Sequence, residues 1–324
     1  MALRLRQSTD LLWRFPNFIQ LDLQSDESER PQLRYDRVLG WDLQPGASGL
    51  LAGRPITISA EGFRNHTPGV RVGRGAAILA VGDSYTEGYA VADDETWPAH
   101  LEHLSGRLVL AAGVRDYGLD QMVLKAERLV PVLRPDTVVL AFIASDIDRT
   151  GRAARNMRHK PYFAVSGDGL VLRNVPVPTG PVPGPNTPIR RVLGHSYLLH
   201  FIMGRVGAYE LWRGDTVDTG QDSDLVACRL MARFAALAQR EKVEALVVGF
   251  PRYEDWAWPK NGERQHRRVA AVLDCARRAG LKTHNTKEAF VKAGVAEDPE
   301  SFFSDWHFND RANALAARLI ASVL

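Results

Sequence analysis

The stretch Gly82-Asp83-Ser84-Tyr85-Thr86-Glu87-Gly88 directly follows the apolar run at residues 76–81. A short apolar run without strict alternation is typical of a buried strand. Small residues before and after a serine let the chain leave a sheet sharply, so that the hydroxyl stands exposed at the carboxyl end of the strand. The sequence therefore predicts a strand that delivers Ser84 as a candidate nucleophile.

Further short apolar runs follow, separated by segments whose apolar residues recur at helical spacing. Strands that alternate with helices indicate a parallel sheet covered by helices on both faces. We therefore predict a three-layer α/β/α domain with a five-stranded, mainly parallel sheet. In such sheets ligands bind beyond the carboxyl ends of the strands, which is where Ser84 would lie. The predicted strands are residues 76–81, 108–112, 137–144, 245–250 and 281–284.

A serine hydroxyl is inert at neutral pH unless a base and an orienting acid activate it. Candidates for both lie in Ser304-Asp305-Trp306-His307-Phe308-Asn309-Asp310, just before a helical run at residues 311–324. His307 could accept the proton of Ser84 while Asp305 orients the imidazole. Alternatively, His307 is a polar residue that flanks a helix, and Asp305 is the N-cap of that helix.

In these two blocks the chain resembles the SGNH, or GDSL-type, hydrolase family. The first block of that family, Gly-Asp-Ser-x-x-x-Gly, is matched by Gly82, Asp83, Ser84 and Gly88, and its last block is an Asp and a His shortly before a C-terminal helix. The resemblance covers residues 75–324. It implies the flavodoxin-like fold of that family and a serine esterase that works through an acyl-enzyme. The implied catalytic triad is Ser84, His307 and Asp305, and no cofactor is implied.

The resemblance also implies an oxyanion hole, and here the chain departs from the family pattern. Besides the amide of the nucleophile, the family uses a glycine amide after the second strand and an asparagine side chain after the third. In this chain Asp116 occupies the position of the family glycine, and Ser145 occupies the position of the asparagine. Asp146 occupies the position of the aspartate that commonly follows that asparagine. A serine hydroxyl donates a hydrogen bond but reaches less far than an amide. Losing one such donor typically costs about 10²–10³ in rate.

These departures leave alternatives open. The Asp116 carboxylate either caps the following helix, a common use of aspartate, or faces the pocket, where it would disfavour an oxyanion or attract a cationic substrate. Ser145 is either a donor or a strand-end residue satisfied by backbone, with Asp146 lining the pocket. The protein is accordingly a hydrolase, an O-acyltransferase with a remodelled oxyanion hole, or a catalytically impaired relative that only binds.

Two regions lie outside the alternation of strands and helices. Residues 1–74 precede this alternation, and residues 30–70 are predicted to form a small β-rich extension that packs against the core. Residues 149–222 interrupt it, with a hairpin-like segment at 165–170 and a proline-rich stretch at 174–188 that resists regular structure. We expect an extension over 1–74 and a catalytic domain over 75–324. The insertion at 149–222 is either a lid or a decoration without contact to substrate.

Aromatic residues near the last predicted strands bear on the substrate. They could stack on sugar rings or hold acyl chains, although core packing is their commoner role. By analogy, the resemblance to bacterial SGNH proteins that process O-acylated carbohydrates implies deacetylation or acyl transfer on a glycan or small-molecule ester. The residues concerned are Tyr253, Trp256, Trp258 and Trp306.

Composition argues against several other classes. The 324 residues are 45% hydrophobic, and the net charge of +3 comes without a basic stripe, so we expect no nucleic-acid partner. No run is long enough to span a membrane, and residues 1–14 lack the apolar core of a signal peptide, so we expect a cytoplasmic protein. Cys228 and Cys275 have no CxxC spacing, from which we expect reduced structural thiols and no metal. The oligomeric state stays open.

Overall fold

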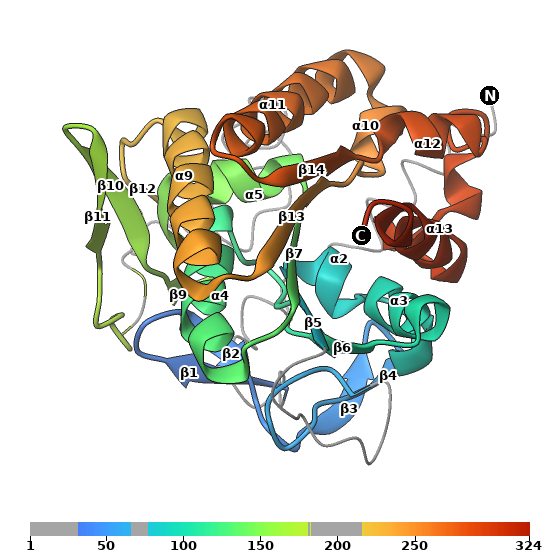
Figure 1. The fold of residues 1–324 in the computed structure, drawn as a ribbon, viewed down its shortest axis with the longest axis horizontal. Helices are drawn as coiled ribbons and strands as arrows, with labels where there is room; N and C mark the ends of the chain where they lie inside the picture. The colour runs from blue at the N-terminus through green and yellow to red at the C-terminus, as the bar shows by residue number, and fades with distance from the viewer. Residues whose placement is uncertain (1–31, 66–76, 181, 183–215) are drawn as a thin grey trace, which may run out of the picture.

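The computed structural model describes residues 32–65, 77–180, 182 and 216–324 (Figure 1). At its centre lies a five-stranded sheet in the order β14-β13-β7-β5-β6, in which every neighbouring pair is parallel. Each strand coincides with one of the apolar runs, so the predicted sheet is confirmed. The strands are β5 (Ala77–Gly82), β6 (Leu108–Ala111), β7 (Thr137–Phe142), β13 (Glu244–Gly249) and β14 (Lys282–Asn285).

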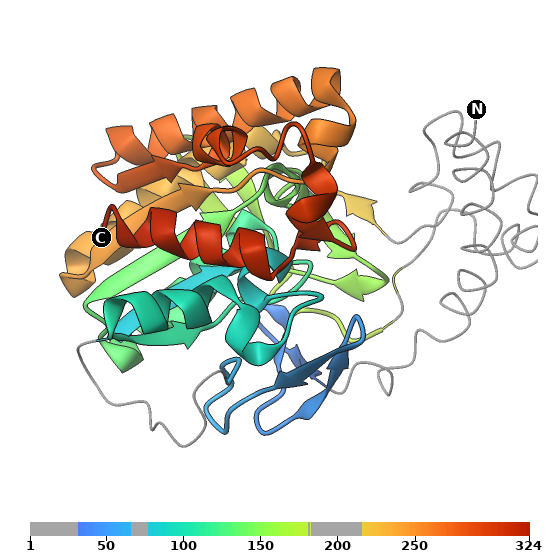
Figure 2. The same cartoon turned by 90° about the vertical axis from the view of Figure 1, so that its right-hand side faces the viewer.

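Helices cover both faces of the sheet, which confirms the three-layer α/β/α architecture. One face packs against α4 (Leu119–Leu133), α9 (Ser223–Glu241) and α11 (Pro259–Arg278). The other packs against α3 (Trp97–Ser105), α12 (Lys287–Lys292) and α13 (Asp310–Ala321), and α3 and α13 lie side by side (Figure 2). Successive residues of β5 alternate between two cores: Leu79 lies in one, Ile78 and Ala80 in the other. A strand buried on both faces has no polar side to display, which is why its sequence does not alternate.

The N-terminal extension forms two antiparallel hairpins. They are β1 (Leu33–Asp36) with β2 (Gly40–Leu43), and β3 (Ser48–Leu51) with β4 (Arg54–Thr57). The Tyr117 hydroxyl donates to the carbonyl of the buried Trp41 at 2.6 Å, and Trp41 Nε1 donates to the Arg115 carbonyl at 3.0 Å. The expected β-rich extension is therefore observed for residues 32–65. Its remaining residues, 1–31 and 66–74, lie outside the described part of the chain.

The insertion after β7 contains β8 (Arg152–Arg155), β9 (Arg158–His159), the hairpin of β10 (Tyr162–Ser166) and β11 (Gly169–Arg173), and β12 (Val217–Asp218). The hairpin predicted at 165–170 is confirmed, and it lies beside α9 (Figure 1). Lys160 is fully buried and anchors the insertion, because its ammonium pairs with Asp120 of α4 and donates to the Pro161 carbonyl at 2.8 Å. Much of the proline-rich stretch, at 181 and 183–188, lies outside the described residues.

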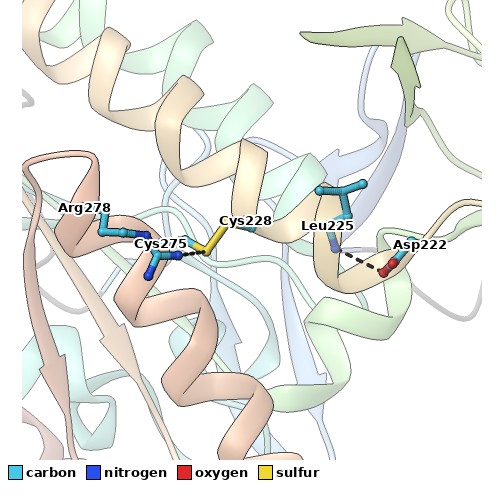
Figure 3. Close-up of a disulfide and its surroundings, with 5 residues drawn as sticks. All are labelled: Asp222, Leu225, Cys228, Cys275 and Arg278. Atoms are coloured by element: carbon cyan, nitrogen blue, oxygen red, sulfur yellow. Dashed lines mark hydrogen bonds between the residues drawn. A yellow bond between two sulfur atoms is a disulfide. The ribbon is translucent and has the colours of Figure 1, made fainter. Parts of the chain in front are cut away.

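A disulfide joins Cys228 of α9 to Cys275 of α11 (Figure 3). The expectation of reduced thiols is therefore wrong. The two Cα atoms lie 5.3 Å apart, within the range that a disulfide can bridge, although the residues are 47 positions apart in sequence. Cysteine spacing could not reveal this pair, because the two helices meet only through the packing of the outer layer. The Arg278 guanidinium donates to Cys275 Sγ at 3.1 Å.

Within the described residues, no helix combines the length and the apolar character needed to cross a bilayer.

Candidate active site

Ser84 is the first residue of the short helix α2 (Ser84–Glu87), which follows β5 through a single residue, Asp83. The Asp83 carboxylate caps α2 by accepting the Tyr85 amide at 2.9 Å. Gly82 leaves no room for a side chain, because a Cβ there would lie 2.0 Å from Thr86 Oγ1. This tight strand-to-helix turn carries the Ser84 hydroxyl beyond the carboxyl end of β5.

Arg64 of the N-terminal extension holds the far end of α2. Its buried guanidinium donates to the carbonyls of Glu87 at 2.6 Å and Val91 at 2.7 Å, and pairs with Asp93 at 2.8 Å. The Glu87 carbonyl lies at the end of α2 and lacks a partner within the helix, so the arginine supplies one. Arg64 could not be predicted from sequence, since nothing in its local pattern distinguishes it from a surface arginine.

His307 reaches Ser84 from the other end of the domain. It lies on the small hairpin of β15 (Phe303–Ser304) and β16 (His307–Phe308), directly before α13. His307 Nε2 lies 2.9 Å from Ser84 Oγ, across 223 positions of sequence. The imidazole packs against Tyr85 and Tyr89, with ring centroids 5.1 and 4.4 Å away. At 2.9 Å a neutral imidazole nitrogen can accept the hydroxyl proton.

Asp305 contacts the same imidazole through its backbone. Its carbonyl oxygen lies 2.8 Å from His307 Nδ1, while its carboxylate is exposed and, among the described residues, makes no hydrogen bond or ion pair. Left-handed φ angles at Asp305 (47°) and Trp306 (67°) form the tight turn of the hairpin. A carbonyl that accepts Nδ1–H selects the tautomer whose Nε2 is free to take a proton. The alternative of an N-cap is wrong, because Asn309 caps α13 by accepting the Ala312 amide.

Tyr85 ties the histidine hairpin to the nucleophile helix. Its hydroxyl donates to the Trp306 carbonyl at 2.9 Å. Burial raises the pKa of Tyr85 well above its ordinary value, so the phenol keeps its proton and remains a donor.

Two buried carboxyls and a guanidinium lie behind Ser84. Arg149 Nη1 lies 2.5 Å from Asp146 Oδ1 and 3.5 Å from Asp83 Oδ2, and Asp146 Oδ2 accepts the Ile143 amide at 2.8 Å. Burial raises the pKa of both carboxyls, and the charge of Asp83 raises that of Asp146 further. The Arg149 guanidinium between the two carboxyls opposes this rise, because a nearby positive charge favours the ionised form of each. Asp146 was expected in the oxyanion or substrate site; instead it is fully buried, with its oxygens committed to these partners.

Asp116 follows β6 in the left-handed conformation, with a φ of 68°. This conformation favours glycine, the residue that the family pattern has at this position. Its carboxylate points toward β8 of the insertion, where Asp116 Oδ1 lies 3.8 Å from Arg155 Nε. The alternative that Asp116 caps α4 is wrong, because Gly118 is the N-cap of α4 and its amide donates to the Gln121 side chain at 3.2 Å. The insertion therefore borders the candidate site through β8.

Ser145 lies in the first turn of α5 (Ala144–Arg149), after β7. Its Oγ accepts a hydrogen bond from Arg252 Nη1 at 2.7 Å, so it is not satisfied by backbone as the alternative proposed. Arg252 follows β13, and Asp255 of α10 (Glu254–Ala257) holds it through its guanidinium at 3.1 Å and its backbone amide at 3.0 Å. Because β5, β7 and β13 are neighbours, Ser84, Ser145 and Arg252 emerge at adjacent strand ends. Arg252 was not among the residues predicted from sequence; its place just after the fourth predicted strand was the available signal.

Aromatic side chains gather around the histidine hairpin. Trp258 stacks on Trp306 with centroids 5.7 Å apart, and Tyr253 meets Trp306 edge-on at 5.1 Å. Trp258 is 52% exposed, so the pair presents an aromatic face to solvent. Trp256, the fourth aromatic residue named from sequence, instead packs partly buried beside the core under α12 and α13. Within the described ranges, no group of His, Cys, Asp or Glu side chains is arranged to hold a metal ion.

No family model and no curated protein matches the chain. It is similar to solved structures of a lipolytic protein of the G-D-S-L family from Veillonella parvula (13% identity, 76% of this chain and 97% of that chain, TM-score 0.44) and of Axe2, an acetylxylan esterase from Geobacillus stearothermophilus (13%, 78% and 95%, 0.44). It is also similar to LAE5, described as an alpha/beta hydrolase enzyme from a lake metagenome (12%, 78% and 95%, 0.47). At such identities and TM-scores these structures assign no activity to this chain. An activity has to be argued from the arrangement of its own residues.

Proposed function

We propose that this chain is a serine-dependent ester hydrolase of the SGNH type. The observation that supports it most directly is the 2.9 Å contact between Ser84 Oγ and His307 Nε2 at the carboxyl edge of the sheet. His307 accepts the proton as Ser84 Oγ attacks the ester carbonyl, and then gives it to the departing alcohol. Water enters along the same path and releases the acid from the acyl-serine. The Asp305 carbonyl holds the imidazole throughout.

The negative charge that develops on the ester oxygen needs donors at the same edge of the sheet. We propose the backbone amides of Ser84 and Asp116 and the hydroxyl of Ser145 for this role. The left-handed backbone of Asp116 supports its alignment with the family glycine. Because its carboxylate points toward Arg155, the negative side chain is drawn toward a positive one rather than left to oppose the oxyanion.

For the substrate we propose a small acyl group on a carbohydrate or a similar hydroxylated compound. The exposed face of Trp258 and Trp306 adjoins His307 and suits the apolar face of a sugar ring. We further propose the division expected from sequence, an extension over 1–74 and a catalytic domain over 75–324 with an insertion at 149–222. Arg64 gives the extension a direct part in holding the nucleophile helix.

The alternative is an O-acyltransferase or an impaired binding protein. It is favoured by one observation, the hydroxyl of Ser145 in place of a longer amide donor. An acyltransferase would form the same acyl-serine and differ only in the acceptor of the acyl group.

The disulfide changes the expected compartment. The expectation of a cytoplasmic protein accompanied that of reduced thiols, but disulfides persist mainly in oxidising environments. We therefore propose that the protein works in an oxidising compartment.

Labelling with a fluorophosphonate, read by intact mass, tests the proposed function. We expect one adduct on the wild type, none on Ser84→Ala, and an unchanged adduct on Ser304→Ala, which removes a nearby exposed hydroxyl. Hydrolysis of p-nitrophenyl acetate and of acetylated sugars should be lost in Ser84→Ala. Labelling with turnover only in the presence of an acceptor alcohol would identify a transferase. Absence of labelling in the wild type would contradict the proposal and leave the binding protein.

A further inference from the structure

A hydroxyl can serve as an oxyanion donor only if its hydrogen points at the oxyanion. The Ser145 hydroxyl has one hydrogen, which rotates about the Cβ–Oγ bond, whereas the amide of an asparagine carries its hydrogens in a fixed plane. A serine in place of an asparagine therefore shortens the reach of the donor and leaves the direction of its hydrogen unfixed, unless another group fixes that direction.

The Arg252 guanidinium restricts the direction of the Ser145 hydroxyl hydrogen. It carries only donors, so at 2.7 Å from Arg252 Nη1 the Ser145 oxygen must be the acceptor. One lone pair is thereby taken, and the hydroxyl hydrogen is turned away from the arginine. Among the described residues, the Ser145 hydroxyl donates to no other group, so its hydrogen is available to a substrate oxygen. The positive charge behind Oγ also makes the hydroxyl a stronger donor.

Arg252 is itself held in place. Asp255 accepts both its guanidinium and its backbone amide, and both residues are 7% exposed. The next helix packs tightly against this turn, since a Cβ on Gly262 would lie 2.2 Å from the Asp255 carbonyl oxygen. A charged side chain that is this deeply buried and this firmly paired is suited to orient a neighbour, and poorly suited to meet a substrate itself.

We propose that Arg252, fixed by Asp255, is a positioning residue that aims the Ser145 hydroxyl at the oxyanion. The serine–arginine pair then does the work of the asparagine amide that this chain lacks. This inference rests on the proposed ester hydrolysis, since it concerns the transition state of that reaction.

The test is a set of variants at both positions, measured by steady-state kinetics on p-nitrophenyl acetate. Arg252→Met removes the group that aims the hydroxyl and keeps an apolar stem; we expect kcat to fall about 10²–10³-fold with KM within about threefold. Ser145→Ala should cause a similar loss. The double variant Ser145→Ala with Arg252→Met should be no slower than Ser145→Ala alone, because both changes remove one donor.

Rescue separates positioning from a structural role. Ser145→Asn placed in the Arg252→Met background should restore kcat to within about threefold of the wild type, since an amide needs no arginine to aim it. The melting temperature of each variant serves as a check on folding. The matched control is Arg229→Met, which removes a half-buried arginine that donates to the Gly167 carbonyl in the insertion, and it should leave kcat unchanged.

Additive losses in the double variant, or a failure of Ser145→Asn to rescue a folded Arg252→Met protein, would overturn the inference. A rise in KM that persists without the Ser145 hydroxyl would also overturn it, and would mean that Arg252 binds substrate directly. In these cases the wild type still hydrolyses the ester and labels at Ser84, so the proposed function stands. A wild type that does neither overturns the proposed function and this inference together.

Discussion

The two partners of the candidate catalytic pair are held in opposite ways. Ser84 stands in front of a buried polar framework in which Asp83, Asp146 and Arg149 satisfy one another at the ends of β5 and β7. His307 sits on a half-exposed two-strand hairpin, held by one carbonyl and by aromatic rings. The position of Ser84 thus depends on buried charged groups, and removing one of them lowers the stability of the fold. The histidine side depends on local turn geometry, where a change affects activity more than stability.

Removing either partner should have the largest effect on activity. Ser84→Ala and His307→Ala should each lower kcat for p-nitrophenyl acetate by about 10⁴–10⁶-fold, and the double variant should be no worse than either, because the two act as one unit. A shift of melting temperature beyond a few degrees in His307→Ala would contradict this difference between the two sides, since it would show that the His307 side chain also contributes to stability.

The framework side should fail through stability. Arg149→Met leaves Asp83 and Asp146 buried without their cation, and we expect a loss of about 3–5 kcal/mol in the free energy of unfolding, measured in urea. The control is Arg240→Met on α9, whose exposed pair with Glu241 should contribute less than about 1 kcal/mol. Equal stability of the two variants would show that the framework does not depend on charge pairing.

The disulfide offers a second stability element, on helices that carry none of the candidate site residues. Cys228→Ser with Cys275→Ser should cost about 2–4 kcal/mol, as expected for a bond that closes a loop of this length. Melting temperature with and without reductant measures the loss. Below the melting temperature kcat should stay within about twofold; a larger fall would mean that packing between α9 and α11 reaches the active site.

The raised pKa of Asp146 predicts a dependence of stability on pH. Because the folded pKa of Asp146 is raised by burial and by Asp83, its contribution is fully present below the ordinary aspartate pKa and is lost as pH rises through the folded pKa. Asp146→Asn stays neutral, so unfolding free energies measured in urea from pH 4 to 8 should decline less with pH than those of the wild type. Parallel curves would mean that Asp146 is ionised in the folded protein.

The smallest effect should come from Asp305→Asn. The imidazole contacts the backbone carbonyl of residue 305, which asparagine also supplies, and asparagine tolerates the left-handed conformation there. We expect kcat to change by less than about threefold. A loss near 10⁴-fold, as found when a triad carboxylate is replaced, would show that the Asp305 side chain turns to Nδ1 in the working enzyme.

Local patterns in the amino-acid sequence predicted the strands, their parallel arrangement and the position of Ser84 after β5. These follow from patterns within a few residues: apolar runs without alternation, helical spacing between them, and a glycine where Thr86 leaves no space for a side chain. The same kind of local pattern predicted His307, because a histidine directly before the last helix can be recognised without knowledge of its tertiary contacts.

Which atoms of the site residues contact one another depends on how the elements pack in three dimensions. Whether residue 305 offers His307 its carboxylate or its carbonyl depends on two backbone angles in one turn. Arg252 reaches Ser145 because β13 lies beside β7, and Cys228 meets Cys275 because α9 packs on α11. Such contacts join segments far apart in sequence, and their geometry depends on side-chain directions that no local pattern records. The sequence therefore determines the elements through short-range preferences, whereas the donors and acceptors of the site are selected by how those elements pack.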